Sequence, residues 1–172
     1  MALPVRVTNL ALGYNEFEDR LVLFVSNADP EALPLLLTRK KAGQLVDGLA
    51  QILERSNALA VRSSAETRAE IVLMERQIAL GAPASSSGPG QETALTIKSG
   101  HRLIVRIDVA IKPNEFVLEF FDPNEVVANL HIGRLDLHRL IEMIKRQADC
   151  VGWNLKLGTP WLNAEQTHFS IN

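Results

Sequence analysis

The two halves of the chain carry the same succession of strand, turn, strand and helix. Residues 21–56 can be laid on residues 116–151 without a gap, at an offset of 95 (116 − 21 = 95). Apolar positions then fall on apolar positions: Leu21, Leu35, Leu37, Leu45 and Leu49 meet Phe116, Leu130, Ile132, Leu140 and Ile144. Few matched residues are identical, so a duplication is unproved. The equal lengths of the elements nevertheless predict two copies of one unit, related by a pseudo-two-fold axis.

The fold class follows from the periodicity of the apolar residues. The segment 103–112 alternates apolar and polar side chains, which predicts a half-buried strand. After the turn at 113–115, a second strand over 116–121 completes a hairpin. We therefore expect an α+β protein in which two pseudo-repeated strand–strand–helix units form antiparallel sheets packed against helices. A central helix over 66–80 connects them.

Local signals mark several element ends. Thr38 is expected to cap a helix that ends near Asn57, and a second helix begins at Ser63 or Ser64, with Ser63 and Glu66 at the spacing of a capping box. Gly152 is well placed to stop the last helix.

Two residues are unfavourable in the elements that are expected to contain them, a proline in a strand and a glycine in a helix. Pro34 cannot donate to a sheet ladder, so its strand is expected at an edge or a bulge. Gly48 lies within the apolar face of a helix, which suggests a close approach to a sheet.

The one strong internal boundary lies at residues 81–92, which contain no large apolar side chain and predict a flexible linker. It separates residues 1–80, the first unit with the connecting helix, from residues 93–172, the second unit with a C-terminal tail. The length suits one compact domain overall.

Composition excludes several classes of protein. Hydrophobic residues make up 47% of the chain and the net charge is −2, which is ordinary for a globular protein and gives no global attraction to nucleic acid or membrane. Cys150 is the single cysteine, so an internal disulfide and multi-cysteine zinc sites are excluded, and we interpret it as a small apolar residue. With no signal-peptide pattern and no long apolar run, a cytoplasmic protein is expected.

A cluster of basic residues is the first candidate site. Arg39, Lys40 and Lys41 follow Thr38 at a predicted helix start, where free backbone donors favour anions, and Arg134 repeats the position of Arg39 in the second half. With Arg139 they could bind an anion or nucleic acid. The alternative is that these side chains are solvated or form structural ion pairs.

Residues with catalytic or metal-binding chemistry form no known motif. His138 and Glu142 are one helical turn apart and could share a metal with His131, but Glu142 with His138 is also an ordinary surface pair. The sequence has no nucleophile elbow, phosphate loop or dinucleotide fingerprint. We therefore assign no catalytic residue, metal or cofactor.

The tail from Trp153 onward is rich in aromatic residues. Residues 153–157 alternate like a strand, and Trp153, Trp161 and Phe169 lie within twenty residues of one another. They either complete the core of their own chain or anchor a partner, as large aromatic side chains often do.

These observations favour a non-enzymatic protein-interaction or assembly protein that forms a homo-oligomer and uses the tail as its interface. A nucleic-acid-associated or regulatory protein acting through the basic residues is the alternative. An enzyme without a recognisable motif is the third possibility.

Overall fold

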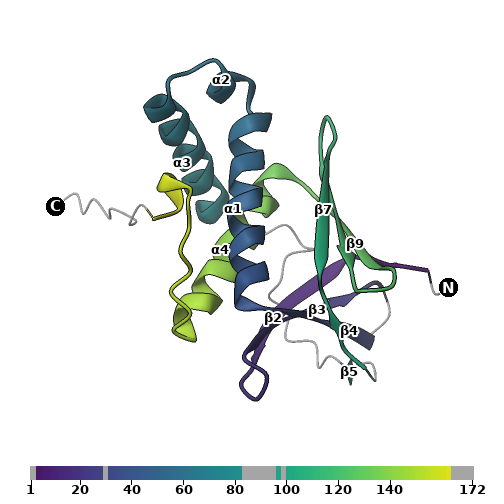
Figure 1. The fold of residues 1–172 in the computed structure, drawn as a ribbon. Coiled ribbons are helices and arrows are strands. Elements are labelled where there is room, and N and C mark those ends of the chain that lie inside the picture. The colour runs from purple at the N-terminus through teal and green to yellow at the C-terminus, as the bar shows by residue number, and fades with distance from the viewer. Residues whose placement is uncertain (1–2, 29–30, 83–95, 98–99, 164–172) are drawn as a thin grey trace.

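The computed structural model describes residues 3–28, 31–82, 96–97 and 100–163 of the chain (Figure 1). The helices are α1 (Arg39–Ser56), α2 (Ala58–Val61), α3 (Ala65–Gly81) and α4 (Arg134–Cys150), with a 3₁₀ turn, η1 (Pro160–Asn163). The strands are β1 (Val5–Val7), β2 (Asn9–Asn15), β3 (Arg20–Ser26), β4 (Glu31–Leu37), β5 (Thr96–Ile97), β6 (Arg102–Leu103), β7 (Arg106–Ile111), β8 (Phe116–Phe121) and β9 (Val126–Ile132). The expected α+β class is confirmed, whereas the linker predicted at 81–92 lies outside the described residues from position 83 onward.

The strands form two mixed sheets instead of purely antiparallel ones. One sheet has the order β1-β9-β8-β7, and the other has the order β2-β3-β4, with β5 and β6 along the far side of β4. The hairpins within each half are antiparallel, as expected. The parallel pairs, β1 with β9 and β4 with β5 and β6, join strands from opposite halves of the chain.

Each half of the chain therefore contributes a strand to the sheet of the other half. β1 runs almost directly into β2, and β6 into β7, so both extended segments pass from one sheet to the next. The two exchanges are equivalent in register. Val7 faces Leu130 and Arg102 faces Leu35, and each of these pairs maps onto the other at the offset of 95 (7 + 95 = 102; 35 + 95 = 130).

The hairpins obey the same offset. Leu23 faces Leu35 in the first sheet, and Leu118 faces Leu130 in the second (23 + 95 = 118; 35 + 95 = 130). This agreement concerns register alone, and the expected superposition of the two units stays a prediction.

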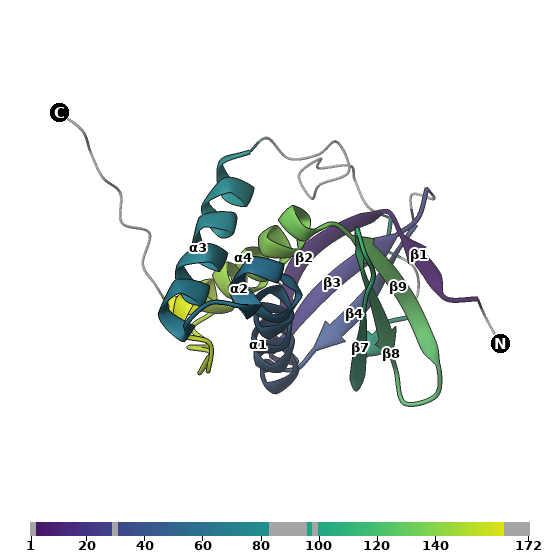
Figure 2. The ribbon, with the colours of Figure 1, turned by 90° about the horizontal axis from the view of Figure 1, so that it is seen from above.

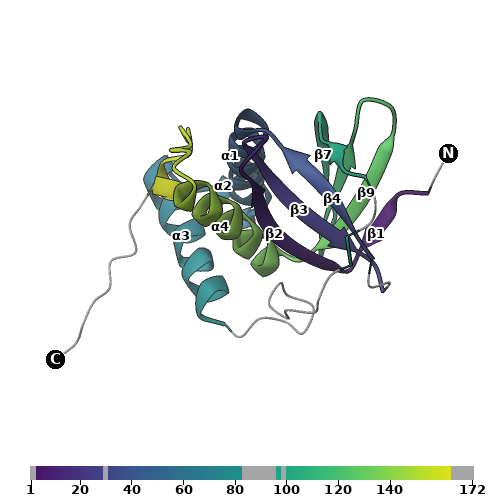
Figure 3. The same ribbon diagram turned by 90° about the horizontal axis from the view of Figure 1, so that it is seen from below.

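The helices lie together on one side of the strands when the molecule is seen from above (Figure 2). The apolar faces of α1 and α4 supply the helical part of the core, with Leu45 and Leu49 on α1 and Leu140 and Ile144 on α4 all buried. From below, β2, β3 and β4 run side by side, and α4 packs against β2 (Figure 3).

The helix ends follow the expected capping chemistry in part. The hydroxyl of Thr38 accepts a hydrogen bond from the Lys41 amide at 3.1 Å and begins α1. Ser64, not Ser63, caps α3 by accepting from the Thr67 amide at 3.3 Å. The Ser63 hydroxyl instead donates to the carbonyl of Leu59, so the expected capping box is wrong. Gly152, at φ +73°, follows α4 as predicted.

Pro34 does not lie in an edge strand, because β4 is paired on both sides. On the far side from β3, β5 pairs with Glu31 and Ala32, and β6 pairs with Leu35 and Leu36. Pro34 therefore faces the interval between these two short strands, where no ladder donor is needed from it.

Two further local expectations are wrong. Residues 153–157 form no strand in the described structure, because they pair with neither sheet; the segment is attached instead through its side chains, such as the Trp153 indole that donates to Asp19. Cys150 is exposed and does not lie in the apolar face of α4.

We predict that Leu23→Ala and Leu118→Ala each lower the free energy of unfolding by about 2–5 kcal/mol, because both side chains are fully buried in equivalent strands. Since the sheets exchange strands, both variants should still unfold in one transition. Urea unfolding followed by circular dichroism measures this, with Leu135→Ala as the control, because Leu135 is 42% exposed. Two separate transitions in either variant would show that the halves fold independently.

Candidate functional site

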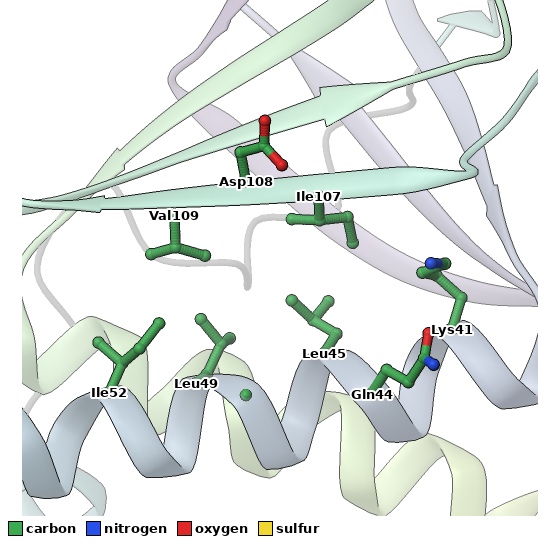
Figure 4. Close-up of a pocket in the computed structure, with 9 residues that line it drawn as sticks. Lys41, Gln44, Leu45, Leu49, Ile52, Ile107, Asp108 and Val109 are labelled. Atoms are coloured by element: carbon green, nitrogen blue, oxygen red, sulfur yellow. The ribbon is translucent and has the colours of Figure 1, made fainter.

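A groove between α1 and β7 is the candidate functional site. It has a volume of about 510 Å³ and is lined by Lys41, Gln44, Leu45, Gly48, Leu49, Ile52, Ile107, Asp108 and Val109. Leu45, Leu49 and Ile52 point from the helix toward Ile107 and Val109 on the strand, while Asp108 points away from the groove (Figure 4). The walls are thus apolar, and the charged residues lie at the rim.

The strand that forms one wall has an unpaired edge. β7 is the last strand of its sheet and, within the described part of the chain, pairs only with β8. The Lys112 amide donates to the Glu115 carbonyl at 2.9 Å, so these residues form a hydrogen-bonded pair of the antiparallel ladder. Because such pairs alternate with non-bonded ones, the backbone groups of Ile107, Val109 and Ile111 point away from β8.

Gly48 keeps the helical wall open. A glycine inside a helix costs roughly 0.5–1 kcal/mol relative to alanine, so it usually serves a close approach. Here a Cβ added at Gly48 would meet no atom within 4 Å, and the expected close approach to a sheet is therefore wrong. The packing of the fold does not require glycine at this position, and the groove beside it has room for a side chain.

The second half of the chain has a smaller equivalent of the groove. A cavity of about 320 Å³ lies between α4 and the start of β2, lined in part by Asp136, Arg139, Leu140 and Met143. Met143 stands at the position that corresponds to Gly48 (48 + 95 = 143). Met143 lines this cavity with a long side chain, whereas Gly48 adds no side chain to the groove beside α1.

The predicted basic residues lie at opposite ends of α1. Arg39 begins the helix, 3.7 Å from Asp19 and over the ring of Trp153, with Lys40 exposed beside it and Lys41 on the groove. Arg134 contacts the last turn of α1, about 20 Å further along a helix that rises 1.5 Å per residue. The five predicted cations therefore do not form one patch.

Arg134 belongs to a largely buried network around Glu75. It donates to both carboxylate oxygens of Glu75, at 2.9 and 3.0 Å, and to the carbonyl of Leu53 at 2.6 Å. Asn57 donates to the same carboxylate at 2.7 Å, and His138, which is fully buried, lies 3.4 Å from it. The network joins α1, α3 and α4.

The network also determines the charge state of Glu75. Burial alone would raise the pKa of Glu75, but the hydrogen bonds from His138 and Arg134 outweigh it, and the charge of Arg134 adds to them. The pKa is lowered from the ordinary 4.5 to about 2. Glu75 is thus an ionised structural carboxylate.

Arg139 has a similar structural role at the end of α3. It donates to the carbonyls of Ala79 and Ala82, at 2.9 and 3.0 Å, and pairs with Asp136 at 2.7 Å. The guanidinium thereby satisfies carbonyls at the helix C-terminus that would otherwise lack partners.

The histidines predicted as metal ligands have separate partners. His131 lies 3.1 Å from Glu115, His138 contacts Glu75, and Glu142 pairs with Arg76 at 2.7 Å. Among the residues that the structure describes, no three potential metal ligands come together.

The two tryptophans of the tail lie in the core of their own chain. The indole of Trp153 donates to Asp19 at 2.6 Å, and that of Trp161 donates to Glu54 at 2.9 Å, with both rings buried. Asp47 accepts from the amide of Gly158 at 3.0 Å. Three carboxylates therefore attach the tail to its own chain, and in this position neither indole can anchor a partner. Phe169 lies outside the described residues.

No helix in the described ranges is both long and apolar enough to cross a membrane. Comparison of the chain with protein-family models, curated proteins and solved structures gives no match.

We predict that Glu75→Gln destabilises the protein most at neutral pH. A carboxylate whose folded pKa is depressed stabilises the fold above its unfolded pKa, and this contribution is lost as the pH falls toward the folded value. The difference in unfolding free energy between wild type and variant should therefore shrink between pH 4.5 and about 2. Urea unfolding at a series of pH values measures it, with the exposed Glu70→Gln as control. A difference that does not change with pH would contradict the assigned role.

We predict that a chain truncated after Gly152 loses its cooperative fold, because it lacks the buried Trp153, Trp161 and Leu162. This outcome is the opposite of the one expected if the tail serves only as an interface. Circular dichroism during heating distinguishes them. A truncated chain with an unchanged melting temperature would show that the tail is dispensable for folding.

Proposed function

We propose that this chain is a non-enzymatic protein-interaction and assembly protein that binds an extended polypeptide segment along the edge of β7. The observation that carries the proposal is the position of Gly48. A side chain at this helix position would meet no atom within 4 Å, and the glycine borders an apolar groove beside a strand whose outer edge is unpaired in the described part of the chain. Addition of a strand to an exposed sheet edge is a common mode of peptide recognition.

The chemistry of the groove matches such a ligand. The outward amides and carbonyls of Ile107, Val109 and Ile111 would bond to the backbone of the added strand. Side chains alternate across a strand, so every second residue of the ligand would lie beside the partly exposed Ile107 and Val109 and face Ile52 on α1, with the buried Leu45 and Leu49 beneath. The preferred segment therefore has apolar residues at alternate positions and polar residues between them.

Anion or nucleic-acid binding at the start of α1 is a second candidate. Arg39, Lys40 and Lys156 line a hollow of about 640 Å³ there. Arg39 is already paired with Asp19, and the nearby Asp47 adds negative charge, so we favour the groove. The cytoplasmic location that we expect from the sequence is part of the proposal.

We predict that Gly48→Met prevents segment binding without harming the fold. The methionine should raise the unfolding free energy by about 0.5–1 kcal/mol through helix propensity, while its long side chain extends into the groove, since a Cβ at this position meets no atom within 4 Å. Gly48→Ala is the matched control, because it gives the same helix gain with a short side chain.

Binding is measured by fluorescence anisotropy with labelled decapeptides that alternate apolar and polar residues. The peptides should bind wild type and Gly48→Ala, and bind Gly48→Met at least about tenfold more weakly, since tenfold corresponds to the loss of roughly 1.4 kcal/mol. Equal affinity for all three proteins, or no binding to any, would overturn the proposal.

A further inference from the structure

We infer that the segment bound along β7 is β7 of a second copy of this chain, paired antiparallel about a two-fold axis at Val109. This inference rests on the proposed function, because it names the occupant of the same edge. Two copies would then join their four-stranded sheets into one continuous sheet.

The outward-facing residues of β7 read the same in both directions. They are isoleucine, valine and isoleucine, at positions 107, 109 and 111. Antiparallel pairing about Val109 places Ile107 opposite Ile111 of the second copy and Val109 opposite its own counterpart. All three outward residues then form hydrogen-bonded pairs, with apolar side chains matched on the face toward α1.

The distribution of charge along β7 favours the same register. In this register Asp108 faces Ala110 of the second copy. A two-fold axis at Asp108 would instead place the two Asp108 carboxylates directly opposite each other, which is destabilising. At the outer ends Arg106 faces Lys112, but each already pairs with a carboxylate of its own chain, at 3.4 and 3.3 Å.

The edge strand of the other sheet differs from β7, because α4 packs against β2 there. A second set of exposed apolar side chains lies on α2 and α3, namely Leu59, Val61, Met74 and Ile78. Nothing in the structure indicates what would cover that set, so it serves as the control surface.

The register is tested by disulfide formation in a Cys150→Ser background, which removes the exposed native thiol. In a hydrogen-bonded pair the Cα atoms lie about 5.5 Å apart, within the range that a disulfide spans. Val109→Cys should therefore form a crosslinked dimer under mild oxidation. Asp108→Cys should not, because the two Cα atoms would be roughly 7–8 Å apart. Crosslinking at position 108 but not at 109 would overturn the proposed register.

The interface is tested by sedimentation velocity of the full chain. Val109→Pro removes one outward-pointing amide and no bond to β8, so it should leave a folded protein whose dimer dissociates at least about tenfold more readily. Ala110→Pro is the matched variant: its amide faces β8, so it should destabilise the fold itself. Met74→Lys, on the control surface, should leave the dimer unchanged.

A wild-type chain that stays monomeric at millimolar concentration, or a dimer abolished by Met74→Lys and not by Val109→Pro, would overturn the inference. Neither result bears on the decapeptide assay. If decapeptides still bind wild type but not Gly48→Met, the occupant comes from another protein and the proposed function stands. If the decapeptides do not bind wild type either, the proposed function is wrong as well.

Discussion

The structure depends on the exchange of short parallel strands between its two halves. β1 completes the sheet of the second half and β6 extends the sheet of the first, so neither sheet is whole without residues from the other end of the chain. Parallel pairs require long connections, and here the connections are the hairpins and helices themselves. The exchange therefore brings α1 and α4 together, and the network around Glu75 can then join them through α3.

The two halves differ in the surface that they leave open, although their strand registers agree. α4 lies against β2, while a groove remains between α1 and β7. The two surfaces differ in a few side chains, above all at position 48, where α1 has Gly48 and the matched position of α4 has Met143. An apolar groove next to an unpaired strand edge is normally an aggregation hazard that proteins cover or charge. Its presence here is the reason for the recognition role proposed above.

The sequence predicted those parts of the fold that local pattern determines. Alternation identified the hairpin of β7 and β8, and Thr38 and Asn57 identified the two ends of α1. The strand exchange was missed because pairings of two or three residues leave no periodic signal. The roles of Arg134 and Arg139 were open for a similar reason: their partners lie about sixty positions away, so only the fold could choose between an anion site and structural pairs. Gly48 was noticed, but the sequence could not distinguish glycine needed for close packing from glycine that leaves space.

The attachment of the tail has a spectroscopic consequence. Both tryptophans of the chain, Trp153 and Trp161, lie in this segment, and their indoles bond to carboxylates from the β2–β3 turn and from α1. Intrinsic tryptophan fluorescence of this protein therefore reports on the docking of residues 153–163 against the β2–β3 turn and α1, and it contains no indole signal from the two sheets.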